Sequence, residues 1–146
     1  MRFLSIIICV LLYSNCLSAQ ENLENVKWTI ELDKDKSELR IEASMKEDWI
    51  LFSQHTDPKG GLPLDFDFVE LKCTKLIGEV EELSTPTVVM SEYFGVELTR
   101  FHNQARFKQK IELTDDTGNL TCHVTYLTCN SKRCLPVVTI PLEVNF

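Results

Sequence analysis

The sequence has no excess of positive charge, no long helical pattern and only three histidines. Its 146 residues include 15 Lys and Arg against 22 Asp and Glu, which gives a formal net charge of −7. A nucleic-acid-binding surface requires clustered positive charge, so this composition argues against that class of protein. No stretch longer than about ten residues keeps the spacing of an amphipathic helix. There is no internal repeat or linker, so we expect a single domain.

The longest apolar run lies at the start of the chain, directly after Arg2. A basic residue, an apolar run and the small-residue sequence at 17–19 (LSA) together predict a secretory signal peptide over residues 1–19. The run is too short for a comfortable membrane span, so we expect residues 20–146 to form one domain without such a span. The alternative is a lipoprotein anchored through Cys16, although the residues before it match a lipobox poorly.

Apolar residues alternate with polar ones along most of the remaining chain, which is the period of a half-buried β-strand. Turn-forming residues separate the alternating segments, so the pattern predicts an all-β sandwich. Gln109 takes one inward position of the strand 105–113. The turn at 115–119 joins this strand to the strand 120–128, and we expect the two to form a hairpin. The other expected strands cover 28–32, 39–43, 49–52, 64–73, 86–90 and 137–146.

Four cysteines follow the predicted signal peptide, and in an oxidising compartment they are expected to form disulfides. Cys129 ends one expected strand and Cys134 begins the next. Facing residues of such a hairpin lie about 4.5–5.5 Å apart at Cα, and a disulfide accepts about 4.4–6.8 Å. Lys132 and Arg133 lie between the cysteines and add positive charge, which favours the reactive thiolate.

Spacing alone leaves three interpretations of this pair: a redox-active disulfide, a structural staple and a metal clip. A staple across so short a loop constrains the unfolded chain little and therefore stabilises little. A zinc site usually has tighter cysteine spacing and a second pair of ligands, which Cys73 and Cys122 do not supply locally.

The other two cysteines are expected to lie toward the core. Cys122 shares the apolar face of its strand with Leu120, Val124 and Tyr126. Cys73 follows the phase of the strand that precedes it. These positions predict either two small buried hydrophobic residues or a disulfide between core strands.

Three stretches of the chain together resemble a known family. The first is 49–56 (WILFSQHT), followed by 60–63 (GGLP) and 66–68 (FDF). The second is 91–95 (SEYFG), and the third is the cysteine hairpin with its continuation CLP at 134–136. In order and spacing they resemble the amino-terminal periplasmic domain of the thiol:disulfide interchange protein DsbD, also called the disulfide bond corrector domain.

The resemblance implies an immunoglobulin-like β-sandwich in the periplasm whose two cysteines cycle between dithiol and disulfide without a metal or organic cofactor. Electrons would come from a thioredoxin-like protein or domain and pass to oxidised periplasmic thiol proteins. By position, Cys134 would form the mixed disulfide with partners and Cys129 would resolve it. The sequence ends at Phe146, before any transmembrane electron channel, so we expect other chains to supply both donor and acceptor.

The resemblance also implies a cap loop in which Tyr93 covers the cysteine pair, with Glu92 and Phe94 beside it and Gly95 as a turn or hinge. Ser91 stands where the family often has Asp, which leaves Glu92 as the acidic residue of this loop. Without the resemblance, the two aromatic residues read as an ordinary edge of the core. The competing function for the whole chain is a secreted binding module with a permanent disulfide.

Overall fold

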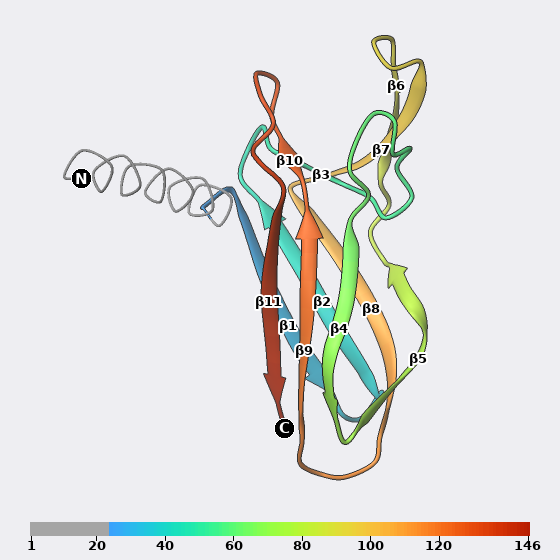
Figure 1. Cartoon of the computed structure of the whole chain (residues 1–146), viewed down its shortest axis with the longest axis vertical. Coiled ribbons are helices and arrows are strands. Elements are labelled where there is room, and N and C mark those ends of the chain that lie inside the picture. Colours follow the sequence, from blue (N-terminus) through green and yellow to red (C-terminus); the bar gives the residue numbers. More distant parts are fainter. Residues whose placement is uncertain (1–23) are drawn as a thin grey trace, which may run out of the picture.

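The computed structural model describes residues 24–146 and confirms the predicted all-β architecture (Figure 1). The predicted signal peptide and Cys16 lie outside the described residues. No helix within the described residues is long and apolar enough to cross a lipid bilayer. The strands are β1 (Val26–Asp33), β2 (Glu38–Met45), β3 (Ile50–Phe52), β4 (Asp65–Lys72), β5 (Thr74–Glu82), β6 (Thr87–Ser91), β7 (Val96–His102), β8 (Gln104–Leu113), β9 (Asn119–Tyr126), β10 (Thr128–Cys129) and β11 (Val138–Asn145).

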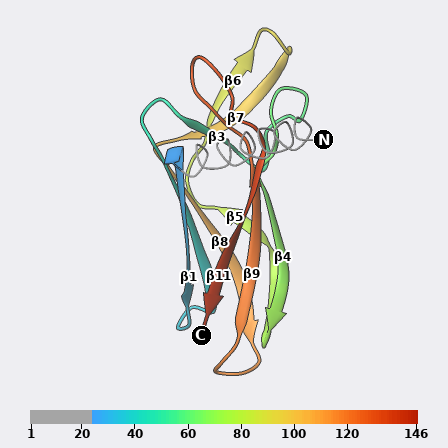
Figure 2. The same ribbon diagram turned by 60° about the vertical axis from the view of Figure 1, so that its left-hand side comes forward.

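The strands form three antiparallel sheets. A four-stranded sheet, in the order β1-β2-β8-β5, packs against a three-stranded sheet, β11-β9-β4, and together they make the predicted immunoglobulin-like sandwich. The third sheet, β10-β3-β7-β6, extends from one end of the sandwich. Both ribbon views place β6, β7 and the turn after β10 at the end opposite the C-terminus (Figures 1 and 2). This third sheet was not predicted, and it carries the cysteine hairpin.

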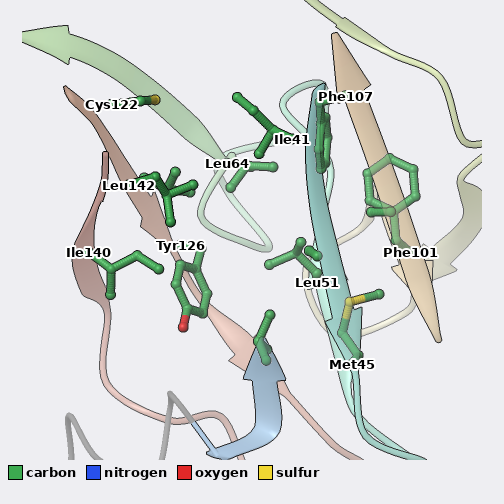
Figure 3. Packing of buried hydrophobic residues seen from close by; sticks show 14 residues of the cluster. Ile41, Met45, Leu51, Leu64, Phe101, Phe107, Cys122, Tyr126, Ile140 and Leu142 are labelled. Carbon is green, nitrogen blue, oxygen red and sulfur yellow. The ribbon is translucent and has the colours of Figure 1, made fainter. Parts of the chain in front are cut away.

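The core lies between the two large sheets because each strand turns its alternate apolar residues inward. Figure 3 shows Tyr126 and Leu142 of one layer facing Ile41 and Phe107 of the other. The Phe107 ring is 1% exposed, and it lies 5.0 Å from the ring of Phe66 and 6.1 Å from that of Trp28. These ring contacts join strands from both sheets and make the aromatic cluster the centre of the sandwich.

Gln109 confirms its predicted inward position, since it is 1% exposed. The neighbouring strand β5 has an irregular register between Ile77 and Glu81, where Gly78 adopts a positive φ of 70°. The Gln109 side-chain amide donates to the carbonyl of Ile77 at 3.1 Å and to that of Lys110 at 2.8 Å. A polar residue is therefore buried here because it satisfies carbonyl groups at the irregularity.

The predicted hairpin between 105–113 and 120–128 is wrong. Strand β8 pairs with β2 and β5, whereas β9 pairs with β11 and β4 in the opposite sheet. Both edges of β8 are thus occupied, and the turn after it carries the chain from one layer to the other (Figure 1). Turn-forming residues show that a chain reverses, but they do not show whether it stays in the same sheet.

The aromatic cluster yields a stability prediction. Phe107→Ala should lower the free energy of unfolding by about 3–5 kcal/mol, because it removes a fully buried ring and leaves a cavity. Urea denaturation followed by circular dichroism measures the change. Ile77→Ala is the control, since Ile77 is 49% exposed. A loss below about 1 kcal/mol for Phe107→Ala would contradict this packing.

Candidate active site at the cysteine hairpin

Cys129 and Cys134 face each other across a tight hairpin and are joined by a disulfide with an S–S distance of 2.00 Å. On one side the Asn130 N–H donates to the Arg133 carbonyl at 2.8 Å. On the other side the Leu135 N–H donates to the carbonyl of the residue before Cys129 at 2.9 Å. The cysteines thus occupy a position without mutual backbone hydrogen bonds, where facing residues come closest. Their Cα atoms lie 3.9 Å apart, somewhat closer than expected.

Asn130 organises the turn between the cysteines. Its side-chain oxygen accepts hydrogen bonds from the backbone N–H groups of Lys132 and Arg133, each at 2.9 Å. Asn side chains commonly form such turns by bonding to backbone groups two residues further along the chain. This role for Asn130 was not predicted from the sequence, although the turn preference of Asn is the signal that points to it.

Strand β10 attaches the hairpin to the third sheet. Cys129 pairs with Ile50, and Thr128 pairs with Leu51 in β3. The Thr128 hydroxyl, which is fully buried, donates to the Ile50 carbonyl at 2.8 Å. This side-chain bond reinforces a strand of only two residues, and it fixes the position of Cys129 on the sheet.

The two cysteines of the disulfide differ in burial. Cys129 is 6% exposed and packs in a small apolar cluster with Ile50 and Phe52, against which Leu98 also lies. Cys134 is exposed, as are Lys132 and Arg133 in the turn before it. The structure therefore brings together the predicted cysteines and basic residues, and it leaves Cys134 as the cysteine that a second protein can reach.

The predicted cap residues lie on a separate loop, between β6 and β7. The loop is closed by hydrogen bonds from the Gly95 N–H to the Ser91 carbonyl, 2.7 Å, and from the Phe94 N–H to the Ser91 hydroxyl, 3.3 Å. Gly95 adopts a positive φ of 67°, which favours glycine. Ser91 therefore closes this loop with both its carbonyl and its hydroxyl.

The aromatic residues of this loop are directed toward solvent. Tyr93 is 89% exposed, and its ring stands edge-on to that of Phe94 at 4.8 Å. Glu92 is also exposed. Strands β3 and β7 separate the loop from β10 in the sheet order, and Figure 1 shows the two tips apart. The Tyr93 ring does not cover the disulfide in this conformation, so its role as a cap stays a prediction.

Cys73 and Cys122 are not bonded to each other, so the core disulfide considered from the sequence is wrong. Cys122 pairs with Phe68 in β4, whereas Cys73 follows the end of that strand. At about 3.3 Å per residue the two positions are roughly 15 Å apart, and a disulfide tolerates about 7 Å at most. Cys122 is instead a buried hydrophobic residue of the core, as the alternative prediction held.

The surroundings of Cys122 suppress its reactivity. Burial, together with the nearby carboxylates of Asp67 and Asp65, raises the pKa of its thiol to about 12. Cys73 is only partly buried, and its φ of 61° marks the turn between β4 and β5. Within residues 24–146, no group of three or more His, Cys, Asp or Glu side chains is arranged to hold a metal ion.

A β-sandwich that presents an accessible disulfide on a short hairpin defines a candidate thiol–disulfide exchange domain. The family model "Thiol:disulfide interchange protein DsbD, N-terminal" matches residues 18–144, and the chain belongs to this family. No curated protein matches the sequence.

Three solved structures share the fold. The N-terminal domain of DsbD from Neisseria meningitidis, in its reduced form, is 14% identical with a TM-score of 0.56, and the match covers 82% of this chain and 85% of that one. The DsbD N-terminal domain of the same organism, in complex with the PilB N-terminal domain, is 12% identical with a TM-score of 0.57, and the match covers 82% of this chain and 86% of that one.

The N-terminal periplasmic domain of ScsB from Proteus mirabilis is 14% identical with a TM-score of 0.55. The match covers 82% of this chain and 45% of that one.

The two free cysteines should differ in reactivity. With the disulfide intact, iodoacetamide at pH 8 should modify Cys73 and leave Cys122 unmodified, because a thiol with a pKa of about 12 holds almost no thiolate at that pH. Peptide mass spectrometry reads both sites. Unfolding in urea is the control, and it should make both cysteines reactive. Similar rates for both in the folded protein would contradict the buried position of Cys122.

Proposed function

We propose that this chain is a periplasmic electron carrier that exchanges Cys129–Cys134 between disulfide and dithiol with thioredoxin-like partners. The observation that carries the proposal is the unequal exposure of the two cysteines, since Cys134 is exposed and Cys129 is held in an apolar cluster. Membership of the DsbD N-terminal family supports the same chemistry. No metal or organic cofactor takes part in the proposed reaction.

The reaction begins when a thiolate of a reduced partner attacks the Cys134 sulfur. The bond between Cys134 and Cys129 breaks, and Cys129 leaves with the electron pair as a thiolate. A mixed disulfide then joins the partner to Cys134. The second cysteine of the partner then attacks the sulfur of the partner's first cysteine in the mixed disulfide and releases Cys134 as a thiolate. The partner is now oxidised, and this chain has gained two electrons and, after proton uptake, two thiols.

The second half of the cycle delivers these electrons. The Cys134 thiolate attacks the disulfide of an oxidised acceptor, and Cys129 then attacks Cys134 in the mixed disulfide and frees the reduced acceptor. Lys132 and Arg133 lie in the turn beside Cys134, where positive charge favours the thiolate that must attack. Cys129 needs no contact with the acceptor, which agrees with its burial.

The compared structures support the choice of partner and compartment. In one of them, a DsbD N-terminal domain from Neisseria meningitidis is in complex with the PilB N-terminal domain. The similar domain of ScsB is described as periplasmic. We infer that this chain also docks a protein domain at its cysteine hairpin, and that residues 1–19 direct it to the periplasm.

The loop between β6 and β7 is proposed to close over the pair when no partner is bound. Closure would bring the Tyr93 ring, now 89% exposed, over the disulfide and exclude water and unrelated oxidants. Gly95, with its positive φ, is the residue of this loop best able to change conformation. The open loop of the present structure leaves Cys134 accessible to a partner.

The two cysteines should behave differently in a trapping experiment. The partner is a thioredoxin that lacks its second cysteine and carries its first as a mixed disulfide with thionitrobenzoate. Reduced Cys129→Ser protein should displace the thionitrobenzoate and accumulate a mixed disulfide through Cys134, because neither protein retains a thiol that can resolve it. Cys134→Ser should give no such complex, since the remaining thiol is buried. Non-reducing electrophoresis and mass spectrometry measure both.

Cys73 is partly buried and could react adventitiously, so each variant is prepared with Cys73→Ser as well. Equal trapping by the two variants would contradict the assigned roles. Failure of the wild-type disulfide to be reduced by any thiol partner would instead favour a binding module with a permanent disulfide.

A further inference from the structure

The segment between β3 and β4, residues 53–64, is tied together at Ser53 and is named the strap here. The Ser53 N–H donates to the Thr99 carbonyl of β7 at 2.9 Å. The Ser53 carbonyl accepts from the N–H groups of Thr56 and Leu64, each at 3.3 Å, so it closes both a short turn and the whole strap. Thr56 returns to β7, since its hydroxyl oxygen accepts from the Thr99 N–H at 3.1 Å.

A carboxylate from the four-stranded sheet of the sandwich accepts hydrogen bonds from the start of the strap. The hydroxyl of Ser53, which is fully buried, donates to Glu82 at the end of β5 and lies 2.9 and 3.0 Å from its two oxygens. The Gln54 N–H donates to the same carboxylate at 2.8 Å. The His55 N–H in turn donates to the Ser53 hydroxyl oxygen at 2.9 Å. Glu82 is therefore the acceptor that fixes the first turn of the strap to the sandwich.

The far part of the strap lies against the apolar cluster that buries Cys129. A Cβ atom added at Gly61 would stand 2.8 Å from ring carbons of Phe52, so the backbone rests directly on that ring. A Cβ at Gly60 would stand 2.6 Å from Leu98 and 3.3 Å from the Phe94 ring of the predicted cap loop. Phe52 and Leu98 both belong to the cluster around Cys129. The strap thus contacts both the apolar cluster around Cys129 and Phe94 of the predicted cap loop.

We propose that Glu82 is a positioning residue for thiol–disulfide exchange, acting through the strap. Its carboxylate holds Ser53 and Gln54, the strap holds Phe52 and Leu98 in place, and these side chains keep Cys129 shielded while Cys134 stays open. Glu82 touches neither cysteine in the proposed reaction. This inference rests on the proposed function, since it assigns the residue that keeps the two cysteines unequally exposed.

A conservative substitution at Glu82 can keep the hydrogen bonds to Ser53 and Gln54. In Glu82→Gln the amide oxygen can still accept from the Gln54 N–H, and the amide N–H can donate to the Ser53 hydroxyl oxygen. Glu82→Ala leaves the Ser53 hydroxyl and the Gln54 N–H without an acceptor in a partly buried place. The two substitutions remove the same charge and differ in whether the strap is held.

The chain also offers a matched control on the same strand. Glu81 precedes Glu82 in β5, and its carboxylate pairs with Lys108 at 2.8 Å on the sheet surface. The Glu81 side chain is 52% exposed. Glu81→Ala therefore removes a carboxylate and an ion pair from the end of β5 without removing an acceptor from the strap.

The test is the rate at which iodoacetamide alkylates Cys129 in reduced protein carrying Cys134→Ser and Cys73→Ser. Adding Glu82→Ala should raise this rate about tenfold, because loss of a buried hydrogen bond shifts a local opening equilibrium by about that factor. Glu82→Gln and Glu81→Ala should stay within about twofold of the parent. All rates are measured at 25 °C on variants whose circular dichroism and thermal midpoint show them to be folded.

The second readout is the rate constant for reduction of the intact Cys129–Cys134 disulfide by reduced thioredoxin. It is measured in the same Glu82 and Glu81 variants, with Cys129 and Cys134 both left in place. Glu82→Ala alone should change this rate constant. The inference is overturned if Glu82→Ala and Glu81→Ala give equal alkylation rates, even if Glu82→Ala lowers the thermal midpoint. Resistance of the wild-type disulfide to both thioredoxin and dithiothreitol would refute the proposed function, while the alkylation rates would still decide whether Glu82 holds the strap.

Discussion

The pairing of the two-residue strand β10 with β3 is the interaction on which the candidate site depends. It places Cys129 opposite Ile50 and secures it with the buried hydrogen bond from the Thr128 hydroxyl to the Ile50 carbonyl. Cys134 lies across the hairpin from Cys129 and is exposed. The disulfide thereby joins a buried cysteine to an exposed one, an arrangement that would direct a partner thiolate to Cys134.

The rest of the molecule supports this arrangement in layers. The two large sheets bury an aromatic core that fixes the end of the sandwich from which the third sheet extends. That sheet joins the cysteine hairpin, the strap and the β6–β7 loop through β3 and β7 (Figure 1). Glu82 links the strap back to the large sheet. In the proposed closure, the β6–β7 loop would move on a base that the strap holds in place, and Cys129 would keep its position.

The sequence predicted the strands whose burial alternates cleanly, such as β2 and β8, and it placed Gln109 inward. It missed β5 and β7, because most of their side chains are exposed or only partly buried and show no regular period. The spacing correctly predicted that Cys129 and Cys134 lie close enough to bond, since contacts across a short hairpin are local. It could not show their unequal exposure, which depends on β3, nor the separation of Cys73 from Cys122, which depends on position along paired strands. Ser53 and Glu82 meet only through tertiary contact.

The most direct test of the account is the midpoint potential of Cys129–Cys134 in the domain 20–146. The protein is equilibrated with glutathione redox buffers, and the fraction of reduced pair is read by thiol labelling and mass spectrometry. A midpoint between about −180 and −270 mV is predicted, which is the range of exchangeable carriers. A midpoint below about −300 mV would mark a structural bond and contradict the account.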